Sequence, residues 1–132
     1  MKASKNLVIG IDIGGTNTVF GMVNRDGKII SRGTISTSAF TEVEKYIDHL
    51  YDAIMPEIEK AGGREMFSGI GIGAPNGNYY KGTIEYAPNL KWQKGIIPFA
   101  EMMEKKFGLP SFLTNDANAA AVGEMKYGAA KN

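Results

Sequence analysis

The chain has 132 residues, with 15 basic and 14 acidic side chains that leave a formal net charge of +1. This length corresponds to one domain with its own core, and the balanced charge excludes a strongly basic nucleic-acid-binding surface. The chain has no cysteine and one histidine, which excludes disulfides, cysteine-ligated zinc and a histidine-rich metal site. No apolar run approaches the roughly 20 residues of a membrane helix, so a cytoplasmic domain is expected.

Three apolar segments open the chain. Residues 7–13 (LVIGIDI) are rich in branched side chains, which is typical of a buried strand. Two glycines separate this run from residues 18–23, and a turn at residues 25–27 leads into residues 28–36. Apolar runs around glycine-containing turns predict hairpins, so the first third is expected to be an antiparallel meander of three strands.

The hydrophobic period then becomes helical. Apolar side chains recur three to four positions apart over residues 43–58, and Gly62 is a suitable helix end. Thr41 and Glu44 have the spacing of a capping box. Pro56 lies inside the pattern, where it is expected to kink or split the helix.

Strands and helices alternate in the rest of the chain. Residues 67–74 predict a strand, and residues 75–97, rich in glycine, asparagine and tyrosine, are expected to be mostly irregular. A short helix is predicted for residues 98–107, a last strand for residues 111–114, and an alanine-rich helix for residues 117–127.

The resulting order, β-β-β-α-β-α-β-α, predicts an α/β fold. A strand followed by a helix favours parallel pairing with the first strand, so a mixed sheet is expected. Ligands in open α/β sheets bind beyond the carboxyl ends of parallel strands. The loops at residues 12–17, 74–78 and 115–118 leave such ends and are expected to face one crevice.

The first of these loops has the composition of a phosphate-binding loop. Gly14 and Gly15 let backbone amides approach an anion, and Thr16 and Asn17 add hydroxyl and amide donors. Asp12, at the end of the strand, is placed to hold a hydrated Mg²⁺ beside the phosphates. The alternative is a simple glycine hairpin with Asp12 facing solvent. The loop lacks the Walker pattern.

The last loop offers a catalytic base. Asp116 is expected where a strand ends and a helix begins, and there a carboxylate caps a helix by accepting backbone hydrogen bonds. The functional alternative is a general base that accepts the proton of an attacking hydroxyl. Phosphoryl transfer depends mostly on positioning, so an aspartate is basic enough for this role. Both roles are compatible, because a carboxylate has two oxygens.

Four segments together make the sequence resemble a known family. The chain is similar to the N-terminal lobe of the ROK sugar kinases, which include bacterial glucokinases and other hexose and N-acetylhexosamine kinases. The first motif is shared by the wider actin and hexokinase superfamily, whereas the last two are more specific. The resemblance implies the ribonuclease H-like, actin-like ATPase fold. The matching segments are Ile11–Asn17 (IDIGGTN), Gly71–Gly77 (GIGAPNG), Gly82–Trp92 (GTIEYAPNLKW) and Leu113–Glu124 (LTNDANAAAVGE).

This resemblance implies an ATP-dependent, Mg²⁺-assisted kinase that transfers a phosphoryl group to a sugar hydroxyl. In its terms Asp12, Gly14, Gly15 and Thr16 look like the first phosphate motif, which binds the ATP phosphates and the metal. The implied partner is a sugar substrate, with neither nucleic acid nor membrane expected and self-association left open. Which sugar is used, and whether ATP or another donor supplies the phosphoryl group, are also open.

The resemblance also implies the residues on the sugar side. Asp116 looks like the catalytic base and Asn115 like the sugar-binding residue beside it. Asn89 matches a position near the sugar. Asn76 and Gly77 occupy a loop that touches the sugar, although many relatives have Pro-Gly there, which puts the contact of Asn76 in question. Trp92 is expected to be a packing anchor, with sugar stacking as the alternative.

The resemblance further implies a division into lobes. Residues 1–116 are expected to form the N-terminal ATPase-type lobe, and residues 117–132 the start of the inter-lobe helix. The Glu-x-Gly-His sugar motif and the cysteine-rich zinc site of the family's second lobe do not occur in this sequence. The chain is therefore interpreted as one lobe of a kinase, inactive by itself.

A non-catalytic, sugar-sensing regulator of the same family is the alternative function. Such repressors carry a DNA-binding helix-turn-helix before the first phosphate motif, and only six residues precede Leu7. The presence of Asp116 also favours catalysis.

Overall fold

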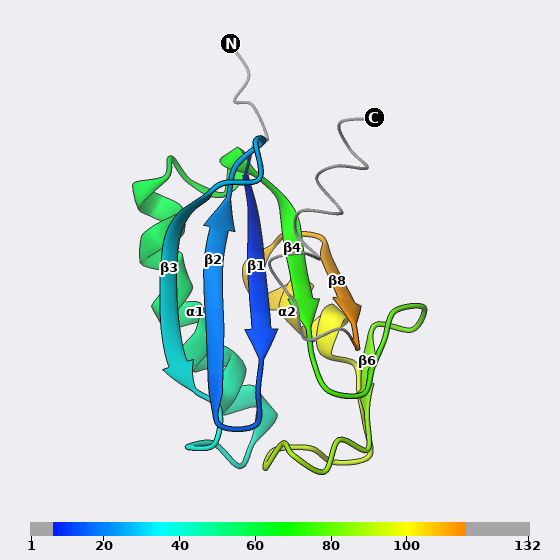
Figure 1. Ribbon diagram of the computed structural model, residues 1–132. Helices are drawn as coiled ribbons and strands as arrows, with labels where there is room; N and C mark the ends of the chain where they lie inside the picture. Colours follow the sequence, from blue (N-terminus) through cyan, green and yellow to red (C-terminus); the bar gives the residue numbers. More distant parts are fainter. Residues whose placement is uncertain (1–6, 116–132) are drawn as a thin grey trace.

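The fold is a mixed five-stranded sheet with two helices on one face, seen in a computed structural model that describes residues 7–115 (Figure 1). The strand order is β3-β2-β1-β4-β8. The first three strands pair antiparallel, and β4 and β8 run parallel to β1. The predicted meander and the parallel pairing are both confirmed. The sheet consists of β1 (Leu7–Ile13), β2 (Asn17–Val23), β3 (Ile29–Ser36), β4 (Phe67–Gly73) and β8 (Ser111–Thr114).

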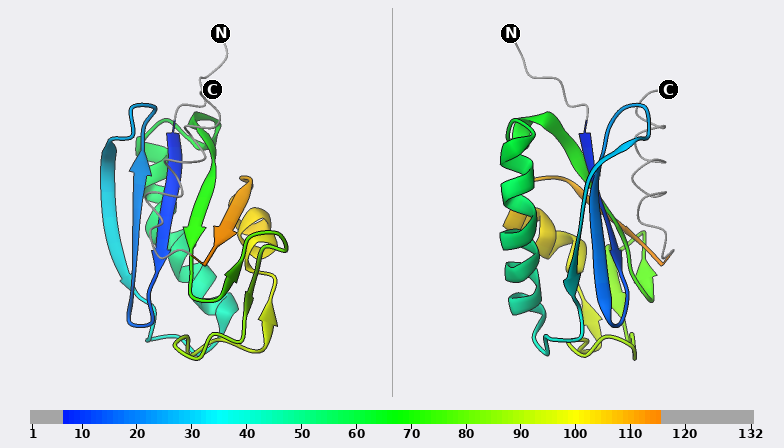
Figure 2. Two further views of the ribbon diagram at one scale, coloured as in Figure 1. Left: turned by 45° about the vertical axis from the view of Figure 1, so that its right-hand side comes forward. Right: turned by 60° about the vertical axis from the view of Figure 1, so that its left-hand side comes forward.

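Alternation along β1 decides which face of the sheet is covered. Ile9, Ile11 and Ile13 are at most 1% exposed and belong to the core cluster. The helices α1 (Val43–Lys60) and α2 (Phe99–Phe107) lie on the same face of the sheet and contribute their buried side chains to this cluster (Figure 2). The core therefore lies between the sheet and the two helices.

Helix α1 differs from expectation in two details. It runs without interruption through Pro56, so Pro56 does not split the helix. Pro56 and Asp52 are both exposed, so water can hydrate the Asp52 carbonyl that loses its helical partner. The predicted capping box is also wrong, because the N-cap is Glu42 and makes no side-chain hydrogen bond.

The segment predicted to be mostly irregular, residues 75–97, is irregular over most of its length but contains a second, small sheet. Its three antiparallel strands are β5 (Gly77–Asn78), β6 (Thr83–Glu85) and β7 (Ile96–Ile97), in the order β5-β6-β7. Strands of two or three residues are too short to show an alternating pattern, so sequence periodicity cannot reveal them. A 3₁₀ turn, η1 (Arg64–Met66), precedes β4.

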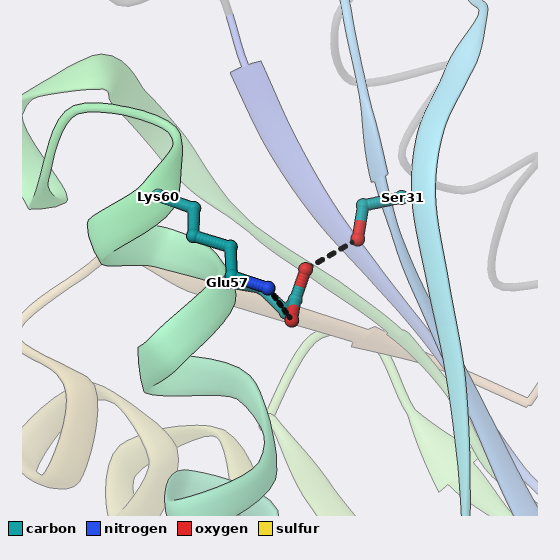
Figure 3. A network of polar contacts seen from close by, with 3 residues as sticks. All are labelled: Ser31, Glu57 and Lys60. Atoms are coloured by element: carbon teal, nitrogen blue, oxygen red, sulfur yellow. Dashed lines mark hydrogen bonds and ion pairs between the residues drawn. The ribbon is translucent and has the colours of Figure 1, made fainter.

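A polar contact joins the edge strand β3 to α1 (Figure 3). The Ser31 hydroxyl donates to Glu57 Oε1 at 2.8 Å, and Lys60 lies 3.6 Å from the other carboxylate oxygen of Glu57. Lys60 is 75% exposed, whereas Glu57 is 30% exposed. The strand-to-helix hydrogen bond is therefore the more sheltered of the two interactions.

The length and hydropathy of the helices can be compared with those of a membrane-spanning helix. Within residues 7–115, no helix combines the length and the apolar character that a bilayer crossing requires.

Candidate functional site

The three parallel strands end in one row. Asp12 of β1 pairs with Gly73 of β4, and Gly73 pairs with Thr114 of β8. The loops that follow β1 and β4, and Asn115 after β8, therefore lie at the same edge of the sheet, toward the bottom of the view in Figure 1. The sequence predicts this convergence, and of the predicted loop at residues 115–118 only Asn115 lies within the described residues.

The β1–β2 hairpin carries the predicted phosphate loop. The Gly14 amide donates to the Asn17 carbonyl at 2.9 Å, which closes the turn. The Thr16 carbonyl accepts from the amides of Thr37 and the residue after it, at 2.8 and 3.2 Å. The amides of Gly15 and Thr16 have no backbone acceptor within residues 7–115. The backbone pairing of the hairpin therefore uses neither of these two amides, and the Thr37 segment holds the loop from behind.

A chain of three buried hydroxyls lies behind this hairpin. Thr18 Oγ1 is 2.6 Å from Thr37 Oγ1 and 2.6 Å from the Tyr46 hydroxyl. All three residues are fully buried. Burial raises the pKa of the Tyr46 phenol far above its usual value, against the opposing effect of its hydrogen bonds, so the phenol stays neutral. These hydroxyls connect α1 to β2 and to the segment that follows β3.

Gly15 is the point at which the phosphate loop touches the predicted sugar segment. A Cβ at Gly15 would lie 2.9 Å from the Asn89 carbonyl oxygen and 3.4 Å from Asn89 Cβ. A side chain at this position would push the two loops apart. The close approach of these two loops therefore requires a glycine at position 15, whether or not an anion also binds there.

Trp92 holds the Asn89 segment against the helices. Its ring stacks on Tyr46 of α1, with centroids 4.7 Å apart, and on Phe99 of α2, with centroids 5.7 Å apart. Trp92 is fully buried, and its Nε1 donor has no hydrogen-bond partner among the described residues, so packing alone holds the ring. The prediction that Trp92 is a packing anchor is confirmed.

A groove with a volume of about 490 Å³ opens beside the ends of β4 and β8. Three predicted sugar residues, Asn76, Gly77 and Asn115, line it together. The phosphate-loop residues, which form the β1–β2 hairpin, do not line the groove. Asn89 does not line it either, and lies beside Gly15 of the hairpin. Asp116, the predicted base, falls outside the described residues. The structure therefore assembles the predicted site in two neighbouring parts.

Asn76 shapes the groove through its side-chain amide. Its Nδ2 donates to the carbonyls of Glu85 and Tyr86, at 2.9 and 3.1 Å. Both Asn76 and Tyr86 have positive φ angles, 57° and 53°, a conformation uncommon for non-glycine residues and strained for a bulky one. Because both amide hydrogens are engaged, only Oδ1 of Asn76 remains for a ligand.

Gly77 allows a second close approach. A Cβ there would overlap the Thr114 carbonyl oxygen at the end of β8 and would also crowd Leu113. The same Thr114 carbonyl accepts a hydrogen bond from the Ala74 amide at 3.0 Å. The hairpin that carries Gly77 thus packs directly on the last parallel strand.

Glu85 is a groove residue that the sequence predictions missed. Its Oε2 accepts from the Thr83 hydroxyl at 2.6 Å and from Asn78 Nδ2 at 3.2 Å. The Thr83 hydrogen bond lowers the pKa of the Glu85 carboxyl below its usual value, more than partial desolvation raises it. The alternation in Thr83-Ile84-Glu85, which places Thr83 and Glu85 on one strand face, was the available signal.

The described residues can be compared with the ligands that Mg²⁺ requires. Residues 7–115 contain no group of three side chains that would cage a metal ion. Mg²⁺ commonly binds one or two carboxylates together with phosphate oxygens and water. Asp12, half-buried at the end of β1 and next to the donors of the hairpin, fits that pattern.

Comparisons with known proteins place this arrangement in a family. The ROK family matches residues 8–132. The glucokinase of Streptomyces coelicolor is 38% identical over 126 residues, which cover 95% of this chain and 37% of that protein. A putative xylose repressor of Caldicellulosiruptor is 36% identical over 131 residues, which cover 97% of this chain and 33% of that protein.

A solved structure agrees with the fold. The ROK family glucokinase from Streptomyces griseus, in complex with glucose and AMPPNP, aligns with a TM-score of 0.69 at 35% identity and covers 94% of this chain and 38% of that one. This chain therefore spans between 33% and 38% of the length of these relatives. The family match extends over nearly the whole sequence and the sheet has the same actin-like ATPase fold, so the chain belongs to the ROK family.

Proposed function

We propose that this chain is the N-terminal lobe of an ATP-dependent sugar kinase that transfers a phosphoryl group to a hydroxyl of a hexose or N-acetylhexosamine. The observation that carries the proposal is the shared edge of β1, β4 and β8. It places next to a polar groove a hairpin whose Gly15 and Thr16 amides have no backbone acceptor within residues 7–115. A phosphoryl donor and a sugar acceptor need two such adjoining sites.

The roles follow from the geometry of the two parts. The Gly15 and Thr16 amides, with Gly14 and Asn17 closing the turn, would bind the phosphates of ATP, which supplies the phosphoryl group. Asp12 would hold the hydrated Mg²⁺. Neutralising and orienting the phosphates is most of what phosphoryl transfer requires of a protein.

The groove would hold the sugar. Asn115 and the Asn76–Gly77 loop would contact its hydroxyls, and Asn89 would border the space between sugar and phosphates. Asp116 would accept the proton of the reacting hydroxyl as that oxygen takes the phosphoryl group and ADP leaves. The Gly15–Asn89 approach supports the role of Asn89, because it places this residue directly beside the phosphate loop.

The test is a coupled kinase assay on the complete protein that contains this chain, with ATP and a panel of hexoses. Asp116→Asn is expected to lower kcat at least 100-fold while sugar affinity stays within about threefold, because the proton acceptor is lost and the binding surface remains. Near wild-type kcat in Asp116→Asn would leave only the helix-capping role for this residue.

Gly15→Val tests the phosphate loop in the same protein. The added side chain is expected to raise the KM for ATP steeply, because it fills the space next to the Gly15 and Thr16 amides. Thermal unfolding separates the packing defect against Asn89 from the loss of nucleotide binding. Unchanged ATP affinity in folded Gly15→Val protein would contradict the assignment.

A sugar-sensing regulator is the second candidate, favoured by the similarity to a putative xylose repressor. It predicts sugar binding with no phosphoryl transfer and no ATP affinity. The kinase assay and a nucleotide-binding titration on the same protein distinguish the two functions.

A further inference from the structure

The loop that leads from β4 into β5 contains the one Asn-Gly pair of the sequence, Asn76–Gly77. An asparagine amide is lost to deamidation when the backbone nitrogen of the following residue attacks the side chain. Glycine in that following position favours the attack, because it has no Cβ to hinder the approach and its backbone is permissive. Asn76 is also exposed to water, which the reaction consumes. The pair therefore has the sequence and the accessibility of a deamidation site.

The reaction needs no reagent other than water. The Gly77 backbone nitrogen gives up its proton and forms a bond to Cγ of Asn76, while the bond from Cγ to Nδ2 breaks and Nδ2 leaves as ammonia. Water then opens the resulting five-membered imide at either of its two carbonyls, which yields aspartate or isoaspartate. No group is oxidised or reduced, and the loss of ammonia makes the conversion one-way.

Hydrogen bonds of the folded chain hold both reacting groups. Nδ2 of Asn76 donates both of its hydrogens, to the carbonyls of Glu85 at 2.9 Å and Tyr86 at 3.1 Å. The Gly77 amide, which becomes the nucleophile once it loses its proton, donates to the Ala74 carbonyl at 3.2 Å. The attack requires the side chain to rotate and these hydrogen bonds to break, so the hairpin must first open.

Packing against β8 adds a second restraint. Gly77 lies so close to the end of β8 that a Cβ on it would overlap the Thr114 carbonyl oxygen and crowd Leu113. Gly77 also pairs with Ile84 of β6. The backbone at Gly77 is thus fixed from two sides, and its nitrogen cannot turn toward the Asn76 side chain without disturbing both contacts. The reaction is therefore coupled to local opening of this part of the fold.

The product does not fit the place that Asn76 occupies. A carboxylate has no hydrogen to donate at neutral pH, so the carbonyls of Glu85 and Tyr86 would lose their shared donor and face a negative oxygen instead. Glu85 is already the one charged residue among the described groove-lining residues, and a second carboxylate would add like-charge repulsion there. Isoaspartate also lengthens the backbone by one carbon beside the close contact with Thr114. Deamidation therefore opposes closure of the hairpin.

Asn24 provides a contrast within the same chain. It precedes Arg25 rather than glycine and lies between β2 and β3. Its Oδ1 accepts hydrogen bonds from the amides of Asp26 and Lys28, at 2.9 and 3.0 Å. A carboxylate oxygen also accepts from amides, so an aspartate fits this turn. The two asparagines thus differ in the direction of their hydrogen bonds, and that direction decides whether the product of deamidation is tolerated.

We propose that Asn76 is a deamidation site whose conversion dismantles the β5–β6 hairpin beside the groove, and that the closed hairpin protects the amide from this reaction. Each opening of the hairpin exposes the amide to attack, and each conversion removes one molecule from the closed state permanently. The modification uses only groups of this chain and water, so it goes beyond the proposed kinase function and does not depend on it.

Deamidation rates test the protection. The complete protein that contains this chain is incubated at mildly alkaline pH, folded and in urea, and each asparagine is followed by peptide mapping with mass spectrometry. In urea Asn76 is expected to convert faster than Asn24 and every other asparagine of residues 7–115. In the folded protein its rate is expected to fall at least about tenfold, as for a group that reacts only on local opening. Labelling by an isoaspartyl methyltransferase identifies the isoaspartate product.

Asn76→Asp reproduces the aspartate product and tests its effect on the hairpin. The amides of Gly82 and Glu85 donate to the carbonyls of Asn78 and Asn76, at 2.8 and 3.1 Å. Their hydrogen exchange is expected to be at least about tenfold faster in Asn76→Asp than in wild type. Asn24→Asp is the matched control, and exchange at these amides should stay within about twofold of wild type. If Asn76→Asp cannot be purified, wild type aged to partial conversion supplies the same comparison, because converted and unconverted peptides are read in one sample.

Three results would overturn the proposal. Equal rates for Asn76 in the folded protein and in urea would show that the hairpin gives no protection. A rate for Asn76 in urea no greater than that of Asn24 would show that the pair is not a deamidation site. Hydrogen exchange in Asn76→Asp that matches wild type would show that the hairpin tolerates the carboxylate. None of these measurements uses the kinase assay, so the two proposals stand or fail separately.

Discussion

Replacing Tyr46 by phenylalanine removes one oxygen from the chain of three buried hydroxyls. The phenylalanine ring keeps its stacking on Trp92, and Thr18 keeps its 2.6 Å hydrogen bond to Thr37. The loss is therefore confined to the hydrogen bonds of the phenol with Thr18 and Thr37, with a net free-energy cost of about 1–2 kcal/mol. For a chain of this size each kcal/mol lowers the melting temperature by about 3–6 °C.

Thr18→Val removes the central hydroxyl of the same chain. Thr37 and Tyr46 both lose the partner they share, and both are fully buried. A buried hydroxyl that loses a hydrogen bond costs about 1–3 kcal/mol, and two hydroxyls lose one here, so Thr18→Val should destabilise by about 2–4 kcal/mol. Thr18→Val is therefore expected to be more destabilising than Tyr46→Phe.

Urea unfolding of wild type and both variants measures these free energies. Tyr51→Phe is the matched control, because Tyr51 lies on the same helix and none of the hydrogen bonds described above involves its hydroxyl. Its free energy of unfolding should change by less than about 0.5 kcal/mol. The reasoning is refuted if Thr18→Val is no more destabilising than Tyr46→Phe, or if Tyr51→Phe costs as much as Tyr46→Phe.

Three further predictions concern pH, the strand-to-helix contact and the groove hairpin. Because burial raises the pKa of the Tyr46 phenol in the folded protein, the contribution of Tyr46 to the free energy of unfolding is fully present below roughly pH 10 and is lost as the pH rises further. Measured against pH, the free energy of unfolding should therefore fall less at alkaline pH in Tyr46→Phe than in wild type. Ser31→Ala should destabilise by about 1 kcal/mol and Lys60→Ala by less than about 0.5 kcal/mol, and equal effects in urea unfolding would show that the Glu57 contacts are misjudged. Gly77→Ala should destabilise by about 1–3 kcal/mol, because its Cβ overlaps a carbonyl of the last parallel strand; sugar affinity should fall with it, and an unchanged melting temperature would contradict the packing described here.

Local patterns were sufficient where an element is long and has one buried face. The apolar run of β1 and the helical spacing of α1 each repeat over several residues, so their type and approximate bounds follow from the sequence. The order of strands and helices then predicts that β1, β4 and β8 are parallel and that Asp12 and Asn115 leave one edge of the sheet. That much of the candidate site was predictable without coordinates.

Contacts between distant segments decided the rest. The approach of Asn89 to Gly15, the engagement of both Asn76 amide hydrogens and the place of Glu85 in the groove each join residues whose proximity no local pattern encodes. The strands β5 to β7 are too short for a period, and they form because they pair with one another and pack on β8. Pro56 is tolerated within α1 because its position is exposed to water, and exposure is a property of the folded molecule rather than of the sequence around it.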